Sequence, residues 1–274
     1  MEPNAASQPP LLEELPGIDT TVAHPARVYD YWLGGHVNFP ADREAGERVL
    51  AATPGLRLRV LANRAFLARA VRFLAGPAGV DQFLDIGTGI PTANNTHEVA
   101  QSVNPKSRVV YVDNDPIVHV HAKALLTTTP DGASDFVQAD LRGPHRVLTS
   151  AARTLDLNRP VALILLGVLH LIQDVEDPWG IVSDLMAALP SGSYLALSHP
   201  AVETNAGQLE AQRRYNERVA TPQTLRTRDD VARFFIGLEM VDPGLVEIHQ
   251  WRPEPDEDLP ASFSSAHGGV GFKR

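Results

Sequence analysis

Short runs of apolar residues recur along most of the chain. They are rich in Val, Ile, Leu and Phe, as strands are, and six of them fall at Gln82–Ile86, Arg108–Val112, Asp135–Ala139, Ala162–Leu166, Tyr194–Ser198 and Val246–Trp251. Helical patterns separate the first five runs, and strands that alternate with helices predict a parallel sheet covered by helices on both faces. The uninterrupted run at Ala162–Leu166 is typical of a central strand buried on both sides.

The glycine-rich segment His267–Arg274 is interpreted as a last strand at an edge of the sheet. With it, the sheet has seven strands. We therefore expect an α/β fold, namely a doubly wound, mostly parallel, Rossmann-like sheet. The acidic, proline-rich segment Pro253–Pro260 is expected to be an exposed loop.

Three helices are expected before the first strand. Pro25 fits the first turn of a short helix that Gly34 and Gly35 end, and a second helix follows Pro40. The chain is thereby divided into a mobile tail, a helical N-terminal extension or lid, and a main domain, which comprise residues 1–23, 24–78 and 79–274.

The third helix has Thr53 as its expected N-cap and Pro54 at its first position, with apolar periodicity as far as Leu74. One stripe of the helical wheel holds the apolar residues Leu56, Val60, Leu67, Val71 and Leu74. The opposite, solvated side is expected to hold Arg57, Arg64 and Arg72. Asn63 falls inside the apolar stripe, where its amide serves either a structural hydrogen bond or a ligand contact.

Composition narrows the function classes. Hydrophobic residues make up 43% of the 274 residues, which is enough for a large core. The net charge of −9 argues against nucleic acid as the main partner. The chain lacks cysteine, which excludes disulfides and thiolate chemistry and fits a cytoplasmic location. Neither a membrane span nor a metal site is expected from the apolar runs and the histidine spacing.

The segment Phe83–Thr92, FLDIGTGIPT, combines an apolar run, an acidic residue and a glycine turn. A strand followed by Gly87-Thr88-Gly89 and a helix builds a nucleotide-sized crevice at the carboxyl end of the strand. Glycine suits this turn because a ligand must approach bare backbone. Pro91 is expected in the first turn of the following helix.

Acidic residues follow the first three strands. Asp85, Asp113 and Asp140 stand where these strands end, and the carboxyl ends of parallel strands share one edge of the sheet. A carboxylate after the second strand can accept hydrogen bonds from both ribose hydroxyls, and Asp140 can accept one from the adenine amine. The three residues together indicate an adenosine site.

The charge of the turn favours one adenosine ligand over another. A dinucleotide fold uses a third glycine near the pyrophosphate, and Thr92 stands in that position here. A carboxylate at Asp85 repels a pyrophosphate but suits a ligand with a cationic amine. S-adenosylmethionine carries an amine and a sulfonium, so the sequence favours it over NAD(P).

The motifs FLDIGTGIPT, VVYVDND, FVQADLR and ALILLGVLHLIQD resemble the successive motifs of class I S-adenosylmethionine-dependent methyltransferases. The N-terminal segments RVYDYWLGGHVNFPADRE and ANRAFLARAVRFLA further resemble a bacterial, largely actinomycete family called S-adenosyl methyltransferase, whose substrates are mostly uncharacterised. The resemblance covers about His24 to Arg274, and its N-terminal motif is the most specific part. It implies a seven-stranded methyltransferase sheet and transfer of a methyl group to an acceptor.

The resemblance also implies positions around the cofactor. It places Asp85, Gly87, Thr88 and Gly89 at the methionine part, Asp113 and Asn114 at the ribose, Asp140 and Leu141 at the adenine, and Gly167 to His170 on the side of the methyl group. The aromatic block around Tyr29, with Gly34 and Gly35, is either a packing arm or a lid over adenine and sulfonium, and the resemblance favours the lid.

Methyl transfer needs a general base only if the acceptor arrives protonated. His170 directly follows the central strand and is the candidate base, with Asp174 to orient it; a structural histidine is the alternative. His199, at the end of the next strand, is a weaker candidate. The polar segments Thr204–Thr221 and Arg228–Leu238 are expected to shape the acceptor pocket.

Three functions remain open at this point. The first is an active methyltransferase with a small-molecule acceptor, which the acidic surface favours over RNA. The second is a non-catalytic protein that binds S-adenosylmethionine, and the third, less favoured, is an NAD(P)-dependent oxidoreductase. The sequence assigns neither the acceptor nor an oligomeric state.

Overall fold

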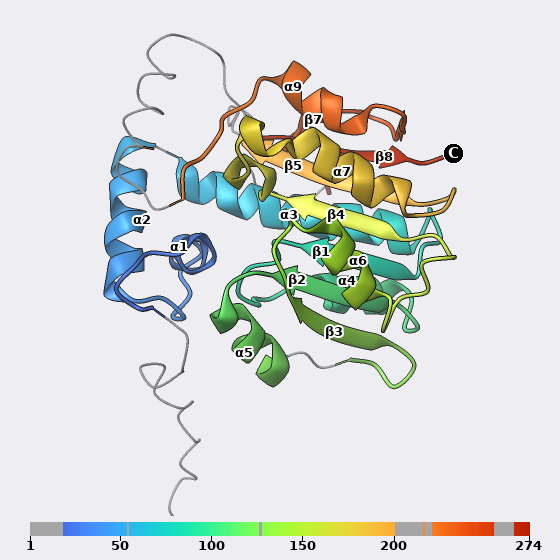
Figure 1. Ribbon diagram of the computed structural model, residues 1–274, viewed down its shortest axis with the longest axis horizontal. Helices are drawn as coiled ribbons and strands as arrows, with labels where there is room; N and C mark the ends of the chain where they lie inside the picture. The colour runs from blue at the N-terminus through green and yellow to red at the C-terminus, as the bar shows by residue number, and fades with distance from the viewer. Residues whose placement is uncertain (1–18, 54, 126–127, 201–215, 217–220, 255–265) are drawn as a thin grey trace, which may run out of the picture.

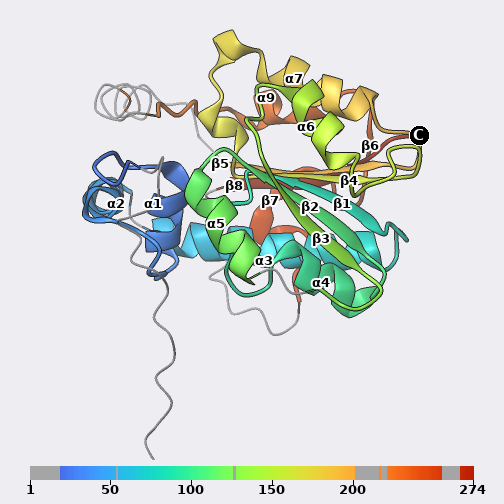
Figure 2. The same ribbon diagram turned by 60° about the horizontal axis from the view of Figure 1, so that its bottom comes forward.

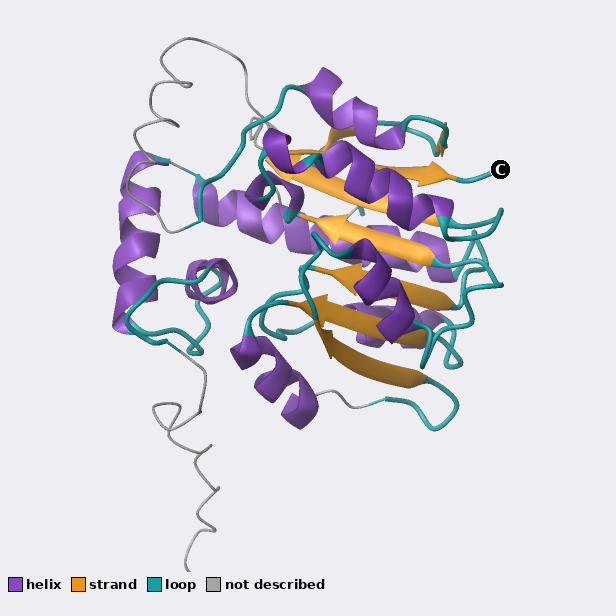
Figure 3. Ribbon diagram, viewed as in Figure 1, coloured by secondary structure: helices purple, strands orange, loops and turns teal. Residues whose placement is uncertain are grey.

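A computed structural model describes residues 19–53, 55–125, 128–200, 216, 221–254 and 266–274 (Figure 1). One mixed sheet lies between two layers of helices, and further helices stand at the edge where the parallel strands end (Figure 3). This confirms the expected α/β, doubly wound, mostly parallel fold. Most of the expected tail and most of the segment Thr204–Thr221 lie outside the described residues, as does most of Pro253–Pro260.

Five parallel strands form the larger part of the sheet, in the order β3-β2-β1-β4-β5. Their bounds are β1 Gln82–Ile86, β2 Arg108–Asp113, β3 Ala133–Gln138, β4 Ala162–Leu166 and β5 Tyr194–Pro200. Leu84 of β1 pairs with Val110 on one side and with Leu163 on the other. The strand order therefore reverses between β1 and β4, and such a switch point opens a crevice at the carboxyl ends of the strands.

The C-terminal strand β8, Ala266–Phe272, differs from the prediction. It runs antiparallel between β5 and β6 and is not an edge strand. The sheet has eight strands in the described part because two short strands, β6 Glu239–Met240 and β7 Val246–Glu247, pair with different ends of β8.

The strand expected at Val246–Trp251 is only two residues long. The chain turns into the 3-10 helix η5, Ile248–Gln250. This turn directs Trp251 away from the sheet and into the core below α3, where its ring packs edge-on against Phe66 and Phe73. Burying this large side chain contributes more free energy to folding than further strand pairing would.

Helices cover both faces of the sheet (Figure 2). One face carries α3 Leu56–Ala75, α4 Thr96–Val103 and α5 Pro116–Leu125, and the other carries α6 Pro144–Ala151, α7 Pro178–Ala187 and α9 Arg228–Ala232. Successive strand residues point to opposite faces, so Phe83 joins the core on the first face and Leu84 joins the core on the second. None of the described helices is long and apolar enough to cross a membrane.

The helices α1, Pro25–Trp32, and α2, Pro40–Ala52, stand at the carboxyl edge of the sheet (Figure 1). Their starting prolines and the left-handed Gly34 agree with the predictions. The start of α3 does not. Thr53 ends α2, and Gly55, with a φ of 83°, is the N-cap of a helix that begins at Leu56.

The helix after the glycine turn also begins later than predicted. α4 starts at Thr96, and its N-cap Asn95 forms a capping box with Glu98. Pro91 therefore lies in a loop. The side chains of Asn95 and Glu98 form hydrogen bonds with free N–H groups at the start of the helix. Pro91 has no side-chain acceptor that could do the same for a helix beginning at its own position.

A cluster of ionisable side chains joins α1 to the sheet domain. His24 Nδ1 lies 2.8 Å from Asp115 Oδ2, and Arg27 Nε lies 3.3 Å from the same oxygen. Arg27 also lies 3.6 Å from Asp42 of α2, so one guanidinium faces carboxylates from both sides. Asp115 accepts a hydrogen bond from the backbone N–H of Ile117 at the start of α5. The N-terminal helices are thus held to the sheet domain through the residue that caps α5.

We expect Asp115→Asn to lower the free energy of unfolding by about 3 kcal/mol, because the variant leaves the buried Arg27 without one of its carboxylates. Asparagine is as good an N-cap as aspartate, so the substitution tests the charge. Urea unfolding measures the effect. Glu44→Gln is the control, since Glu44 forms an exposed ion pair with Arg48 and its loss should cost less than about 0.5 kcal/mol. Equal effects of the two substitutions would contradict a stabilising role for the contact between Asp115 and Arg27.

Candidate functional site

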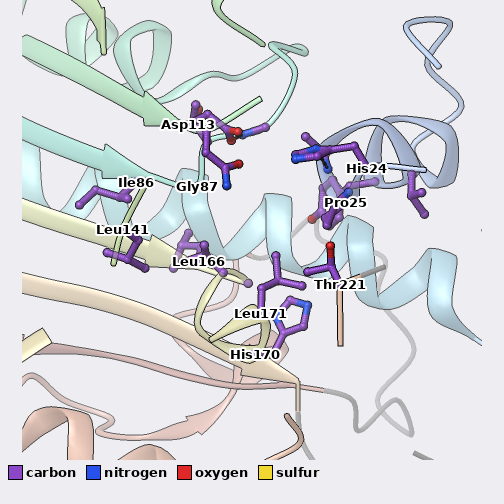
Figure 4. A pocket seen from close by; sticks show the side chains of 18 of the residues that line it. His24, Pro25, Ile86, Gly87, Asp113, Leu141, Leu166, His170, Leu171 and Thr221 are labelled. Carbon is purple, nitrogen blue, oxygen red and sulfur yellow. Dashed lines mark hydrogen bonds between the residues drawn. The ribbon is translucent and has the colours of Figure 1, made fainter. Parts of the chain in front are cut away.

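A cavity of about 350 Å³ lies at the carboxyl edge of the sheet, below α1, α2 and α3. Its volume is in the range of small-molecule sites. Figure 4 shows Gly87 and Asp113 on one side, His24 and Pro25 opposite them, and His170, Leu171 and Thr221 at the far end. Backbone and side chains from β1, β2, β4 and the N-terminal helices therefore surround one space.

The glycine turn forms part of the cavity wall. Gly87 and Gly89 have φ values of 74° and 66°, which L-residues rarely adopt. A Cβ on Gly87 would lie 2.4 Å from Cγ2 of Val168, in the loop after β4. The turn thus requires glycine for both its backbone conformation and its close approach to the neighbouring loop. Thr88 also lines the cavity.

Asp113, the last residue of β2, is a buried acid in the cavity wall. Its carboxylate accepts hydrogen bonds from the backbone N–H groups of Gly89 (2.9 Å) and Asp115 (3.0 Å). Burial raises the pKa of Asp113, although these two hydrogen bonds and the nearby His24 act in the opposite direction. Each carboxylate oxygen keeps a lone pair for a ligand, because each accepts one protein hydrogen bond.

Asp140, Leu141 and Asn114 form the neighbouring part of the wall. Asn114 Nδ2 donates to Asp140 Oδ2 at 3.3 Å, and the backbone N–H of Arg142 donates to Asp140 Oδ1 at 2.8 Å. Burial would raise the pKa of Asp140, but these hydrogen bonds and the charge of Arg142 outweigh it and lower the pKa. An ionised carboxylate therefore stands beside the buried, apolar Leu141.

Asp85 does not line the cavity, although the sequence placed it there. Its carboxylate is buried and accepts a hydrogen bond from Thr96 Oγ1 at 2.6 Å. Burial raises the pKa of Asp85 to about 6. Its contact with the methionine part stays a prediction.

Gly34 and Gly35 likewise lie outside the cavity wall and shape the connection from α1 to α2. A Cβ on Gly35 would lie 2.0 Å from Oδ1 of Asp30.

His170 lines the cavity from the 3-10 turn η2, Leu169–Leu171. Its Nδ1 is buried and has no hydrogen-bond partner among the described residues. Burial lowers the pKa of His170 well below its usual value, and the nearby His199, Arg59 and Arg226 act in the same direction. The imidazole is therefore neutral near pH 7.

Asp174 does not orient His170. It accepts hydrogen bonds from Nε and Nη2 of Arg226 instead, at 3.1 and 2.7 Å. The remaining Arg226 N–H groups donate to the carbonyls of Leu169 and Ile172 and to His199 Nε2. All five donors of this buried guanidinium are used. Arg226 therefore fixes the loop that carries His170.

His199 is fully buried, and Arg226 and the carbonyl of Pro200 occupy its two ring nitrogens. Burial lowers the pKa of His199 to about 4. The residue does not line the cavity, contrary to the expectation that it could face a substrate.

Tyr29 and Asn63 lie together on the helical side of the cavity. Asn63 Nδ2 donates to the Tyr29 hydroxyl at 3.2 Å, and Asn63 Oδ1 accepts from Ser198 at 2.6 Å. Asn63 therefore forms structural hydrogen bonds and also lines the cavity, where a ligand could contact it. Gly167 is beside it, since a Cβ there would lie 3.4 Å from Asn63 Nδ2.

The sequence analysis did not assign His24 or Arg64 to the cavity wall, although both line it. His24 contacts Asp115 and faces Asp113 (Figure 4). Arg64, expected on the solvated side of α3, lines the cavity and donates to the carbonyls of Ala93 and Asn94 after the glycine turn. Helical periodicity gives no signal for either residue, because the surface they face belongs to a distant loop.

We expect the stability of the Asp85→Asn variant relative to the parent protein to depend on pH. A folded-state pKa near 6, against about 4 in the unfolded chain, means that the folded protein binds the extra proton. The parent protein therefore loses stability as the pH rises from about 4 to 6, on the order of 3 kcal/mol. The variant keeps an oxygen acceptor for Thr96 and lacks this loss. Urea unfolding at several pH values measures the difference, and a constant difference would contradict the buried carboxylate.

Comparison with known proteins agrees with this site. The model of the S-adenosyl methyltransferase family matches residues 13–274, and no curated protein matches the chain. A DUF574 family protein from Streptomyces avermitilis MA-4680 has 45% identity and a TM-score of 0.88, over 93% of this chain and 99% of that one. A methyltransferase candidate from Thermobifida fusca YX has 41% identity and a TM-score of 0.84, over 94% and 98%. The glycine turn and acidic strand ends thus lie in a chain that belongs to the S-adenosyl methyltransferase family, whose members use S-adenosylmethionine as the methyl donor.

Proposed function

We propose that this methyltransferase transfers the methyl group to a small molecule bound in the same cavity as the cofactor. The observation that carries the proposal is the continuity of the cavity from Asp113 to His170 and Thr221. We call the part around Gly87, Asp113 and Leu141 the cofactor half, and the part around His170, Leu171 and Thr221 the acceptor half. The helices α1 and α2 cover both, so a compact acceptor fits better than a polymer.

The cofactor half fits S-adenosylmethionine. Asp113 has a free lone pair on each oxygen and would hold the ribose hydroxyls. Asp140 and Leu141 would hold the adenine, one through its amine and the other through its ring face. The glycine turn leaves bare backbone for the methionine part. Carboxylates near the turn suit the positive charge of this cofactor and would repel a pyrophosphate.

Arg64 completes the cofactor half. Its Nη2 holds the loop at residues 93 and 94, while the hydrogen bonds of the described residues leave its Nε and Nη1 unused. A guanidinium in the wall beside the glycine turn suits the carboxylate of the methionine part.

The bound cofactor supplies a methyl carbon already activated by the sulfonium. The protein therefore mainly positions the acceptor and excludes water. The aromatic rings of Tyr29 and Trp32, which meet edge-on, close the helical side of the cavity. His170 is neutral and can accept a hydrogen bond from an acceptor, but its lowered pKa makes it a weak base. An acceptor that needs little deprotonation suits this site.

The net charge of −9 supports a small acceptor over nucleic acid, because a polyphosphate backbone is repelled by an acidic protein.

Incubation with methyl-labelled S-adenosylmethionine tests this function. We expect label in the low-molecular-weight fraction of an actinomycete extract, and loss of transfer in Asp113→Ala together with at least tenfold weaker cofactor binding by calorimetry. The control is Asp184→Ala, at an exposed position on α7. Label confined to RNA or protein fractions, or no label in any fraction, would contradict a small-molecule acceptor.

Arg64→Gln should weaken S-adenosylmethionine binding about tenfold, because a charge-assisted pair with the methionine carboxylate is lost. Binding of 5′-methylthioadenosine, which lacks the amino-acid part, should stay unchanged. Calorimetry with both ligands separates this role from a general change in the cavity. The assignment fails if the variant binds both ligands equally more weakly.

A further inference from the structure

Arg59 is a half-buried arginine on α3, one helical turn before Asn63, and lies on the face of the helix that meets the cavity. Its charge acts on Tyr29 and on His170, which both line the cavity from different elements. Arg59 is not one of the residues that line the cavity, but the backbone next to it is close to Tyr29, because the Tyr29 hydroxyl lies 3.4 Å from the carbonyl oxygen of Val60. Arg59 therefore belongs to the part of α3 that contacts α1 beside the cavity.

No carboxylate of the described residues pairs with the guanidinium of Arg59, and none of these residues forms a hydrogen bond with that guanidinium. Every other arginine near the cavity has such partners: Arg64 holds two backbone carbonyls, Arg226 is paired with Asp174, and Arg48 is paired with Glu44. The charge of Arg59 is therefore not compensated by any carboxylate of the described residues, in a protein whose net charge is −9.

An uncompensated, partly desolvated guanidinium destabilises the protein that carries it. Burial also lowers the pKa of Arg59, because the loss of hydration disfavours the charged form of the guanidinium. The fold gains nothing from this charge, since it forms no bond within the described chain. Residues that break such a local rule are expected at functional sites, where a ligand supplies the missing partner.

The groups near Arg59 indicate which chemical class of ligand could be that partner. His170 offers a buried Nδ1 without a hydrogen-bond partner in the described protein, and the Tyr29 hydroxyl has only a long contact of 3.4 Å to the carbonyl of Val60 to donate to. Leu171, Ile172 and Trp32 supply apolar surface nearby. The site thus combines a cation and a hydroxyl donor with an apolar wall.

We propose that the methyl acceptor is a carboxylate with an apolar body, and that Arg59 binds its anionic group between Tyr29 and His170. The proposal rests on the proposed function and names the substrate class of the same site. It makes Arg59 a specificity-determining residue, because an uncharged acceptor of the same shape leaves the guanidinium unpaired.

Benzoate and benzamide test the proposal, since they share an apolar ring and differ in charge. Each is titrated by NMR into protein saturated with S-adenosylhomocysteine, the demethylated cofactor. We expect benzoate to bind at least tenfold more tightly than benzamide, with a preference that decreases as salt is added. Arg59→Gln should abolish this preference, and Arg59→Lys should retain part of it. Arg57→Gln is the matched control, because Arg57 is exposed one half-turn away and contacts Tyr31.

The outcomes separate the inference from the function on which it rests. Cofactor binding without any preference for benzoate, or a preference that survives in Arg59→Gln, overturns the role of Arg59 and leaves the methyltransferase assignment intact. Failure of the parent protein to bind S-adenosylhomocysteine contradicts the proposed cofactor half. Thermal unfolding adds a second readout: Arg59→Gln should raise the Tm, because an unpaired charge is removed, whereas a structural arginine would lower it on removal.

Discussion

The carboxylate of Asp113 is the constraint on which the site depends. One oxygen holds the backbone of the glycine turn at Gly89, and the other holds the backbone of Asp115. Asp115 in turn faces His24 and Arg27 from the N-terminal helix. A turn, a helix start and a covering helix are thus connected through two acidic residues that are adjacent in space. A change in any one of them alters the others, because buried charges tolerate little displacement.

The sequence predicted the parts of this arrangement that depend on local rules. The strands from Gln82 to Ser198 were recognisable from apolar runs, and the glycine turn and the acids at strand ends followed from the edge that parallel strands share. The start of α3 at Leu56 and of α4 at Thr96 was not recognisable, because Gly55 and Asn95 competed with a more conspicuous proline nearby.

The remaining differences arise from contacts distant in the sequence. Asp174 pairs with Arg226 across 52 positions, so proximity to His170 in the sequence was misleading. Arg64 lies on a polar stripe that meets the loop after the glycine turn. The division of the C-terminal strands reflects burial of Trp251 under α3. Helical and strand periodicity report which side of an element is buried but not which element covers it.

Arg226 has a consequence for how the enzyme family can diversify. Four of its five N–H groups fasten the loop at Leu169, Ile172 and Asp174 to the segment that begins with Thr221, and the backbone N–H of Thr224 also donates to the carbonyl of His170. The rim of the proposed acceptor half is therefore attached by Arg226, and the cofactor contacts proposed on β1 and β2 take no part in this attachment. Substitutions around Thr221 and Gln223 can consequently alter which molecules are accepted while the machinery for the methyl donor is inherited unchanged.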